Sequence, residues 1–294
     1  MPRVQSNGLE LEYETFGAAS DPVLLLVMGL GAQLTDWPLE FCQSLADQHF
    51  RVIRFDNRDA GLSTSLDALG VPDLQALLTG TATAPYLLAD LAEDTVGLLD
   101  ALGITKVHIV GASMGGMIVQ QFAVDHPDRL LSLCSIMSTT GDRSVGQPTP
   151  EALSILGLPP AANRDEAIEN GVRGNRIIRS TGFEIVEPDV RERIAANYDR
   201  SYRPLGSLRQ TAAILVSPDR TAGLHDVTVP TVVIHGTADP LVDVSGGRAT
   251  AAAVPGAELV LIPGMGHDLP RGAWAQVLGA IGDNAAKAAA TPVD

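Results

Sequence analysis

A serine flanked by glycines is the first residue whose type and position could do chemistry. It lies in the stretch GASMG at residues 111–115, after a strand-like apolar run at 106–111 and before an apolar helical run at 117–127. A sharp turn from strand to helix holds a serine hydroxyl at the carboxyl end of the strand, and neighbouring chain comes too close for side chains in place of the two glycines. The pattern predicts that Ser113 is a nucleophile; the alternative is an ordinary tight turn.

A serine hydroxyl is a weak nucleophile near neutral pH and needs a base to take its proton. His267 follows LIPGMG, a predicted strand end with two glycines, so its loop reaches the same sheet edge as the serine. It also completes the chain order Ser, Asp, His expected of this turn motif. His108 lies inside an apolar strand and His235 precedes the acid in sequence, so we expect structural and supporting roles for them. A histidine on a surface loop is the alternative for His267.

The base in turn needs a carboxylate that fixes its tautomer. Asp239 lies just past the apolar run at 231–236, where Gly236 allows a turn and Pro240 restrains the loop. Asp243 and Asp142 are rival acids, and an aspartate that only stabilises its own turn is the third possibility. We predict Asp239 as the acid.

Acyl transfer also requires two backbone N–H groups that bind the developing oxyanion. The residue after the nucleophile, Met114, supplies one, and the loop MGLG after the run at 22–29 supplies the other, from Leu30 between Gly29 and Gly31. A plain strand-end turn is the alternative for this loop. We further expect Gly29, Gly31 and Trp37 to contact substrate, with Trp37 at the pocket floor beside Leu30 and Met114.

Six short apolar runs must position these residues, and helical segments alternate with them. Such runs are typical of parallel strands buried on both faces, and the alternation predicts an α/β fold with a doubly wound, mostly parallel sheet. Alternating polar and apolar residues around Asn7 and Gly8 predict an antiparallel hairpin at the start. The strands are expected at 22–29, 51–56, 106–111, 132–137, 231–236 and 258–264, and helices at 37–48 and 87–103.

The stretch 139–220 lacks a comparable strand signal. Residues 141–220 hold eleven Arg and eleven Asp or Glu, whereas the rest of the chain holds nine basic and twenty-four acidic residues. Several prolines are expected to break the stretch into short helical pieces, and its charges to pair on helix surfaces. We predict a helical cap (lid) at 139–220 inserted into a core formed by 1–138 and 221–294.

Composition excludes several classes of function. The chain has 294 residues and a net charge of −15, which argues against a nucleic-acid partner. The two cysteines form no metal-binding or disulfide pattern, and neither a signal peptide nor an integral membrane segment is visible. We therefore expect a cytoplasmic protein with no metal and make no prediction of its oligomeric state.

Together these motifs resemble the α/β-hydrolase superfamily over nearly the whole chain. The matching stretches are VMGLGAQLTDW, FDNRDAGLS, VGASMGGMI, GTADPLV and PGMGHDLP, and within the superfamily they look most like the aclacinomycin methylesterase group and the lipase-G-type actinobacterial esterases. The resemblance implies ester hydrolysis through an acyl-enzyme without a cofactor. Met28 stands where that superfamily usually has His, and Arg58 matches a loop arginine that we expect to be a structural brace.

We therefore predict a carboxylic ester hydrolase that acts on a small to medium apolar ester. A cofactor-free perhydrolase of the haloperoxidase type and a C–C bond hydrolase would keep the same three side chains and remain alternatives. A non-catalytic receptor and a membrane-associated lipase are further alternatives, the first disfavoured by the intact Ser, Asp and His.

Overall fold

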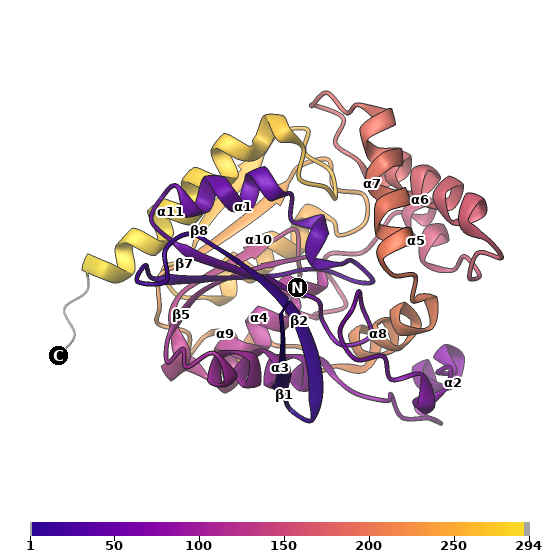
Figure 1. The fold of residues 1–294 in the computed structure, drawn as a ribbon, viewed down its shortest axis with the longest axis horizontal. Helices are drawn as coiled ribbons and strands as arrows, with labels where there is room; N and C mark the ends of the chain where they lie inside the picture. Colours follow the sequence, from indigo (N-terminus) through magenta and orange to yellow (C-terminus); the bar gives the residue numbers. More distant parts are fainter. Residues whose placement is uncertain (1, 291–294) are drawn as a thin grey trace.

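The computed structural model describes residues 2–290, and within them eight strands form one sheet (Figure 1). Their spatial order is β1-β2-β4-β3-β5-β6-β7-β8. All six predicted apolar runs form strands. The strands are β1 (Arg3–Ser6), β2 (Leu9–Phe16), β3 (Val23–Val27), β4 (Arg51–Phe55), β5 (Val107–Ala112), β6 (Leu130–Ile136), β7 (Thr231–Gly236) and β8 (Glu258–Ile262).

The sheet is parallel except at its first edge. Strand β1 pairs antiparallel with β2, and β2 antiparallel with β4, whereas all later neighbours run parallel. Asn7 and Gly8 join β1 to β2 with φ angles of 48° and 77°, the left-handed conformation that a tight hairpin turn requires. The predicted hairpin is thus confirmed. The parallel arrangement brings the carboxyl ends of β3, β5, β7 and β8 to one edge of the sheet.

Helices cover both faces of the sheet, because alternate residues of each strand point to opposite sides. On β3, Leu24 and Leu26 pack in one core with α1 (Leu39–Ala46) and α11 (Trp274–Ala290). Leu25 and Val27 pack in the other with α3 (Leu88–Ala101) and α4 (Met114–Asp125). Figure 1 shows α1 and α11 on one side of the sheet and α3 and α4 on the other. Shorter elements complete these layers: α2 (Leu74–Leu78), α9 (Thr221–Leu224), α10 (Val244–Ala253) and the 3₁₀ turns Leu34–Asp36, Asp67–Leu69, Pro127–Arg129 and Arg271–Ala273.

The stretch predicted as a cap is helical, and we call residues 139–220 the cap segment. It contains α5 (Pro150–Leu156), α6 (Arg164–Ile178), α7 (Glu187–Arg200) and α8 (Pro204–Val216), which lie together to one side of the sheet (Figure 1). The expectation of short pieces was wrong for α6, α7 and α8, which have 15, 14 and 13 residues. The helices α5, α7 and α8 each have proline in the first turn, where the missing N–H costs no hydrogen bond.

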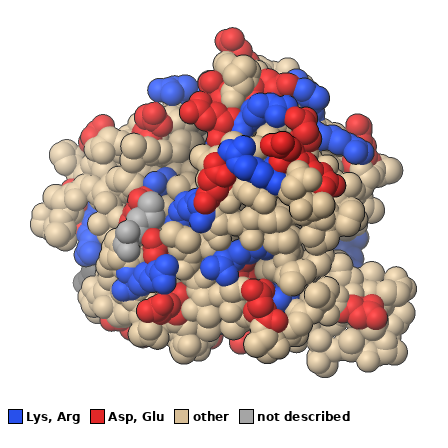
Figure 2. Space-filling view, turned by 45° about the vertical axis from the view of Figure 1, so that its right-hand side comes forward, with Lys and Arg blue, Asp and Glu red and all other residues tan. Residues whose placement is uncertain are grey.

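Opposite charges pair across the cap helices, as expected. Exposed ion pairs link Arg164 to Asp199 at 2.7 Å and Arg191 to Glu169 at 2.7 Å, both between α6 and α7. Figure 2, which brings this side of the molecule forward, shows basic and acidic side chains interleaved in its upper part. This surface therefore presents mixed charge of both signs.

Buried ion pairs attach the cap segment to the core. Arg209 on α8 is fully buried and donates from Nε and Nη2 to the two carboxylate oxygens of Asp59, at 2.8 and 2.7 Å. Arg200, at the end of α7, lies 2.8 Å from the buried Asp56 carboxylate. Breaking a buried pair leaves an uncompensated charge, so these contacts favour a firmly docked cap segment.

Within residues 2–290, no helix is both long enough and apolar enough to cross a membrane.

Candidate active site

Ser113 occupies the turn between β5 and α4. Its backbone lies at φ 57° and ψ −121°, a strained conformation for a residue with a side chain. A Cβ atom on Gly111 would collide with the carbonyl oxygen of Gly115, and one on Gly115 with that of Val27. The two glycines are therefore required by close backbone contacts, as the sequence predicted. Because Ser113 directly precedes α4, the positive end of the helix dipole lies beside it.

His267 lies on the loop after β8 and contacts Ser113. Its Nε2 lies 2.9 Å from Ser113 Oγ, and its Nδ1 lies 2.8 Å from Asp239 Oδ2. The imidazole is largely buried, with 8% of its side-chain surface exposed. The structure thus brings together the three residues that the sequence selected from three separate loops.

Asp239 is held by its own turn as well as by the imidazole. Its Oδ1 accepts hydrogen bonds from the N–H groups of Leu241 and Val242, both at 2.9 Å, so that Oδ2 is left to face His267. Asp239 therefore stabilises its own turn and also contacts the imidazole of His267. The structure places His235 beside it, with Nε2 donating to Val242 O at 2.8 Å and lying 3.5 Å from Asp239 Oδ2.

The electrostatic surroundings keep Asp239 ionised. Burial of the carboxyl group raises its pKa, but His267 and the hydrogen bonds from His235, His267 and Val242 outweigh burial and hold the pKa well below its usual range. A permanently charged carboxylate at this position stabilises an imidazolium on His267.

The rival acids lie elsewhere. Asp243 caps α10 by accepting from Ser245 N at 2.9 Å, and Asp142 accepts from the N–H and hydroxyl of Ser144 at 2.8 Å. The structure gives neither carboxylate a contact with His267.

The cap segment forms hydrogen bonds with the loop that carries His267. The N–H of His267 donates to Ile178 O at 2.7 Å, and Ser180 Oγ accepts from Gly266 N at 2.9 Å. Asp268 accepts from both the N–H and the hydroxyl of Ser180, at 3.0 and 2.5 Å. Three consecutive residues around the imidazole are therefore held by a segment about 88 residues away in sequence. Sequence reasoning missed Ser180 and Asp268, because no local pattern indicates such a contact.

One candidate oxyanion group, the N–H of Leu30, lies in the loop beside Ser113, and the other, the N–H of Met114, follows Ser113 in the chain. Gly29 lies against the nucleophile, because a Cβ atom on it would be 3.0 Å from Ser113 Cβ. Within residues 2–290, no hydrogen-bond acceptor engages the N–H of Leu30 or of Met114. The N–H of Gly31, by contrast, donates to Gln210 Oε1 at 2.7 Å. Leu30 and Met114 therefore have the free amides that the predicted role requires, and Gly29 and Gly31 stay predictions as substrate contacts.

Trp37 is placed differently from its predicted position at a pocket floor. Its side chain has no exposed surface and stacks on Phe41, with ring centroids 5.7 Å apart, in the core that contains α1 and α11. Burial removes the large apolar surface of the indole from water, while its buried Nε1 has no hydrogen-bond partner among the described residues. We therefore do not carry Trp37 into the proposed site.

Arg58 is a structural brace, as expected. It is buried and donates from Nε and Nη2 to the two carboxylate oxygens of Asp94, both at 2.6 Å, and it lies over the ring of Tyr86.

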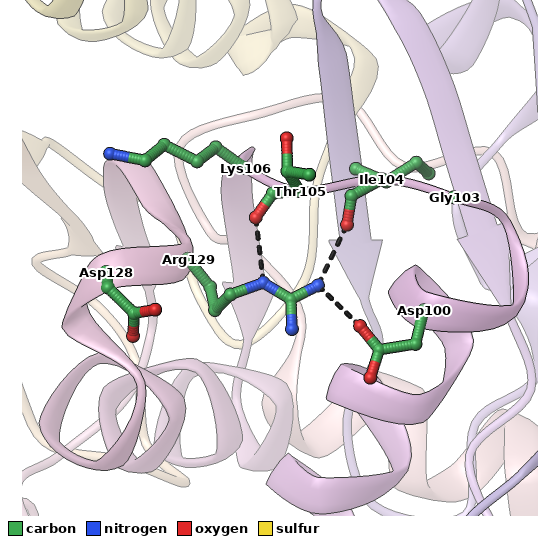
Figure 3. Close-up of a pocket in the computed structure, with 7 residues that line it drawn as sticks. All are labelled: Asp100, Gly103, Ile104, Thr105, Lys106, Asp128 and Arg129. Atoms are coloured by element: carbon green, nitrogen blue, oxygen red, sulfur yellow. Dashed lines mark hydrogen bonds and ion pairs between the residues drawn. The ribbon is translucent and has the colours of Figure 1, made fainter.

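A surface hollow of about 600 Å³ lies away from these residues (Figure 3). Its floor is Arg129, which donates from Nε to Thr105 O and from Nη2 to Ile104 O and Asp100 Oδ1, at 2.7 to 2.8 Å. Figure 3 shows the guanidinium pointing at these partners, so Arg129 ties the end of α3 to the loop that precedes β5. The hollow contains none of the predicted site residues.

Comparisons with known proteins identify the family of this chain. The alpha/beta hydrolase fold family matches residues 22–270. The chain is 31% identical over 282 residues to rhodomycin D methylesterase DauP of Streptomyces sp. (strain C5), covering 87% of this chain and 88% of that protein.

Comparison with solved structures gives the same fold. A thermophilic esterase from Thermogutta terrifontis is 26% identical with a TM-score of 0.71, covering 98% of this chain and 99% of that one. A meta-cleavage product hydrolase from Pseudomonas fluorescens IP01 is 20% identical with a TM-score of 0.71, covering 98% and 96%, and shares the fold. The predicted fold class and family resemblance are thus confirmed. The chain belongs to the alpha/beta hydrolase fold family and is a hydrolase.

Proposed function

We propose that this protein hydrolyses carboxylic esters through an acyl-enzyme formed on Ser113. The observation that carries the proposal is the continuous chain of contacts from Ser113 Oγ through His267 to Asp239, at 2.9 and 2.8 Å, beside two unengaged backbone amides. A nucleophile, a base, an orienting acid and an oxyanion site are the four parts that acyl transfer needs.

In the first half of the reaction, Ser113 Oγ forms a bond to the ester carbonyl carbon while its proton passes to His267 Nε2. The N–H groups of Leu30 and Met114 stabilise the carbonyl oxygen as it becomes negative, and Asp239 stabilises the imidazolium. The C–O bond to the alcohol then breaks, and the alcohol leaves with the proton from His267. The products of this half are the free alcohol and an acyl group on Ser113.

In the second half, water takes the place of the alcohol. It loses a proton to His267 as its oxygen bonds to the acyl carbon, and the same amides stabilise the second oxyanion. The proton returns to Ser113 Oγ as the bond to the acyl group breaks. Acid is released and the enzyme regains its starting state, so the cycle needs no cofactor.

The preferred substrate in this proposal is a small to medium apolar ester. The identity to a rhodomycin D methylesterase supports the ester class, and methyl esters of bulky acids belong in the first test. A perhydrolase or a C–C bond hydrolase would use the same three side chains, so substrate panels distinguish them.

The test compares wild type with Ser113→Ala on nitrophenyl esters of graded chain length and on bulky methyl esters, with a C–C cleavage substrate in parallel. We expect ester turnover by wild type alone, and similar thermal stability of both proteins. Retention of substantial ester turnover by Ser113→Ala, or turnover of the C–C substrate only, would contradict the proposal.

A further inference from the structure

We propose that Gln210, on cap helix α8, is a positioning residue that holds the oxyanion loop, Met28–Gly31, in register with Ser113. The inference rests on the proposed function, because it concerns the amide of Leu30 in that loop. It goes beyond it by giving a residue of the cap segment a part in the chemical step.

Both polar atoms of the Gln210 side chain are used at this junction. Oε1 accepts from Gly31 N at 2.7 Å, and Nε2 donates to Arg58 O at 2.8 Å. The side chain has no exposed surface. Its neighbour in sequence, Arg209, is anchored by the buried pair with Asp59, so Gln210 projects from a fixed point of the helix.

The other end of the loop is held from the core. Strand β3 ends at Val27, so the loop lies beyond the backbone ladder of the sheet. Asn57 Nδ2 donates to Met28 O at 2.9 Å. The peptide groups on either side of Gly29 and Leu30 are therefore each tied by one side-chain amide, Asn57 from the core and Gln210 from the cap segment. These two amides supply polar support to a loop in which Met28 has an apolar side chain.

The position of this loop matters for chemistry because Gly29 lies so close to the nucleophile that a Cβ atom on it would be 3.0 Å from Ser113 Cβ. The loop is thus confined on the Ser113 side by contact, and Gln210 restrains it at Gly31 on the far side of Leu30. An oxyanion donor works only at hydrogen-bond distance from the place where charge develops, and displacement by about 1 Å costs on the order of 100-fold in rate.

Loss of the Gln210 contact should loosen the loop without unfolding the protein. Gly31 is exposed, so water can replace the lost acceptor at its N–H. Its φ of 66° needs no hydrogen bond to persist in a glycine. The buried Arg58 O also loses its donor, which lowers stability without abolishing the fold, as the loss of the Asn284 amide should in the control. The expected defect is therefore in transition-state stabilisation rather than in fold.

The experiment replaces Gln210 by Met, which matches its length and removes both hydrogen bonds. The matched control is Asn284→Leu, which removes another buried amide, one that donates to Leu133 O and Pro230 O far from the loop. We expect Gln210→Met to lower kcat about 10- to 100-fold with little change in KM, and the control to keep both constants.

A second measurement isolates the oxyanion. A trifluoromethyl ketone that adds to Ser113 forms an oxyanion, whereas the matching alcohol does not. Gln210→Met should weaken binding of the ketone about 10-fold or more and leave binding of the alcohol unchanged. If Gln210→Met does not fold, Gln210→Asn takes its place, since it is one methylene too short to reach both partners.

The outcomes separate the two proposals. Ester turnover that persists in Ser113→Ala would overturn the proposed function itself. Turnover that depends on Ser113, together with wild-type kcat and ketone affinity in the Gln210 variants, would overturn this inference alone. An equal loss of kcat in Gln210→Met and Asn284→Leu would also overturn it. The loss would then follow from removing any buried side-chain amide, not from the position of the oxyanion loop.

Discussion

Replacement of Asp239 by Asn should invert the hydrogen bonding of His267. Two backbone N–H groups, of Leu241 and Val242, donate to Asp239 Oδ1 at 2.9 Å, so the oxygen of an Asn side chain must occupy that position. Its NH₂ group then faces His267 Nδ1, which must accept instead of donate. The imidazole proton then lies on Nε2, which faces Ser113 Oγ. A protonated Nε2 has no lone pair free to accept the serine proton.

The expected magnitude follows from this change of tautomer. In a Ser-His-Asp triad, the wrong tautomer lowers kcat by about 10⁴-fold, which corresponds to about 5 kcal/mol of transition-state stabilisation. The fold should survive, because the turn at Leu241 and Val242 keeps its acceptor. We expect thermal stability within a few degrees of wild type and a KM close to that of wild type.

The assay is steady-state hydrolysis of a nitrophenyl ester, with Asp243→Asn as the matched control. Asp243 lies four residues further along and only caps α10, so its variant should keep kcat within about threefold of wild type. A folded Asp239→Asn enzyme with kcat within about tenfold of wild type would show that Asp239 does not set the tautomer of His267. So would an equal loss in the two variants.

Two further predictions concern stability. Arg209→Met should lower the free energy of unfolding by about 3–5 kcal/mol in urea titration, because the buried Asp59 carboxylate loses the arginine it pairs with. The control, Arg164→Met, breaks an exposed pair and should change the free energy of unfolding by about 1 kcal/mol or less. A loss of under about 1 kcal/mol for Arg209→Met would contradict this. Burial lowers the pKa of His108 to about 4, so neutral His108 contributes fully above the unfolded value of about 6.5 and its contribution is lost as pH falls towards 4. In unfolding titrations across this range, wild type should lose up to about 3 kcal/mol more than His108→Asn; equal pH dependence of the two proteins would speak against it.

The sequence indicated Ser113, His267 and Asp239 as catalytic candidates because each carries a local signal. A few residues suffice to recognise each signal: the glycines around Ser113, the strand end before His267 and the turn at Asp239. Parallel strands then bring the carboxyl ends that carry these residues to one edge of the sheet. The same reasoning located every strand. It failed for the prolines of the cap segment, since proline at a first helical turn and proline between helices look alike without knowledge of where each helix begins.

The contacts that connect cap and core were beyond sequence reasoning. Gln210 lies 179 residues from Gly31, and Ser180 lies 88 residues from Asp268. Such pairs depend on how helices dock on a sheet, and the hydrophobic periodicity of a sequence does not specify that docking geometry. Trp37 shows the converse: it lies near the predicted site in sequence but packs in the core with Phe41, and its local sequence does not distinguish these two places.

Active-site labelling distinguishes Ser113 from every other candidate nucleophile. Wild type is treated with a nitrophenyl phosphonate, and nitrophenol release, intact mass, peptide mapping and residual ester hydrolysis are followed in the same samples. We expect one phosphonyl group per chain on Ser113, activity lost in proportion to labelling, and no label in Ser113→Ala. Full labelling of another residue, or hydrolysis that persists after Ser113 is fully labelled, would contradict the role of Ser113 as the nucleophile.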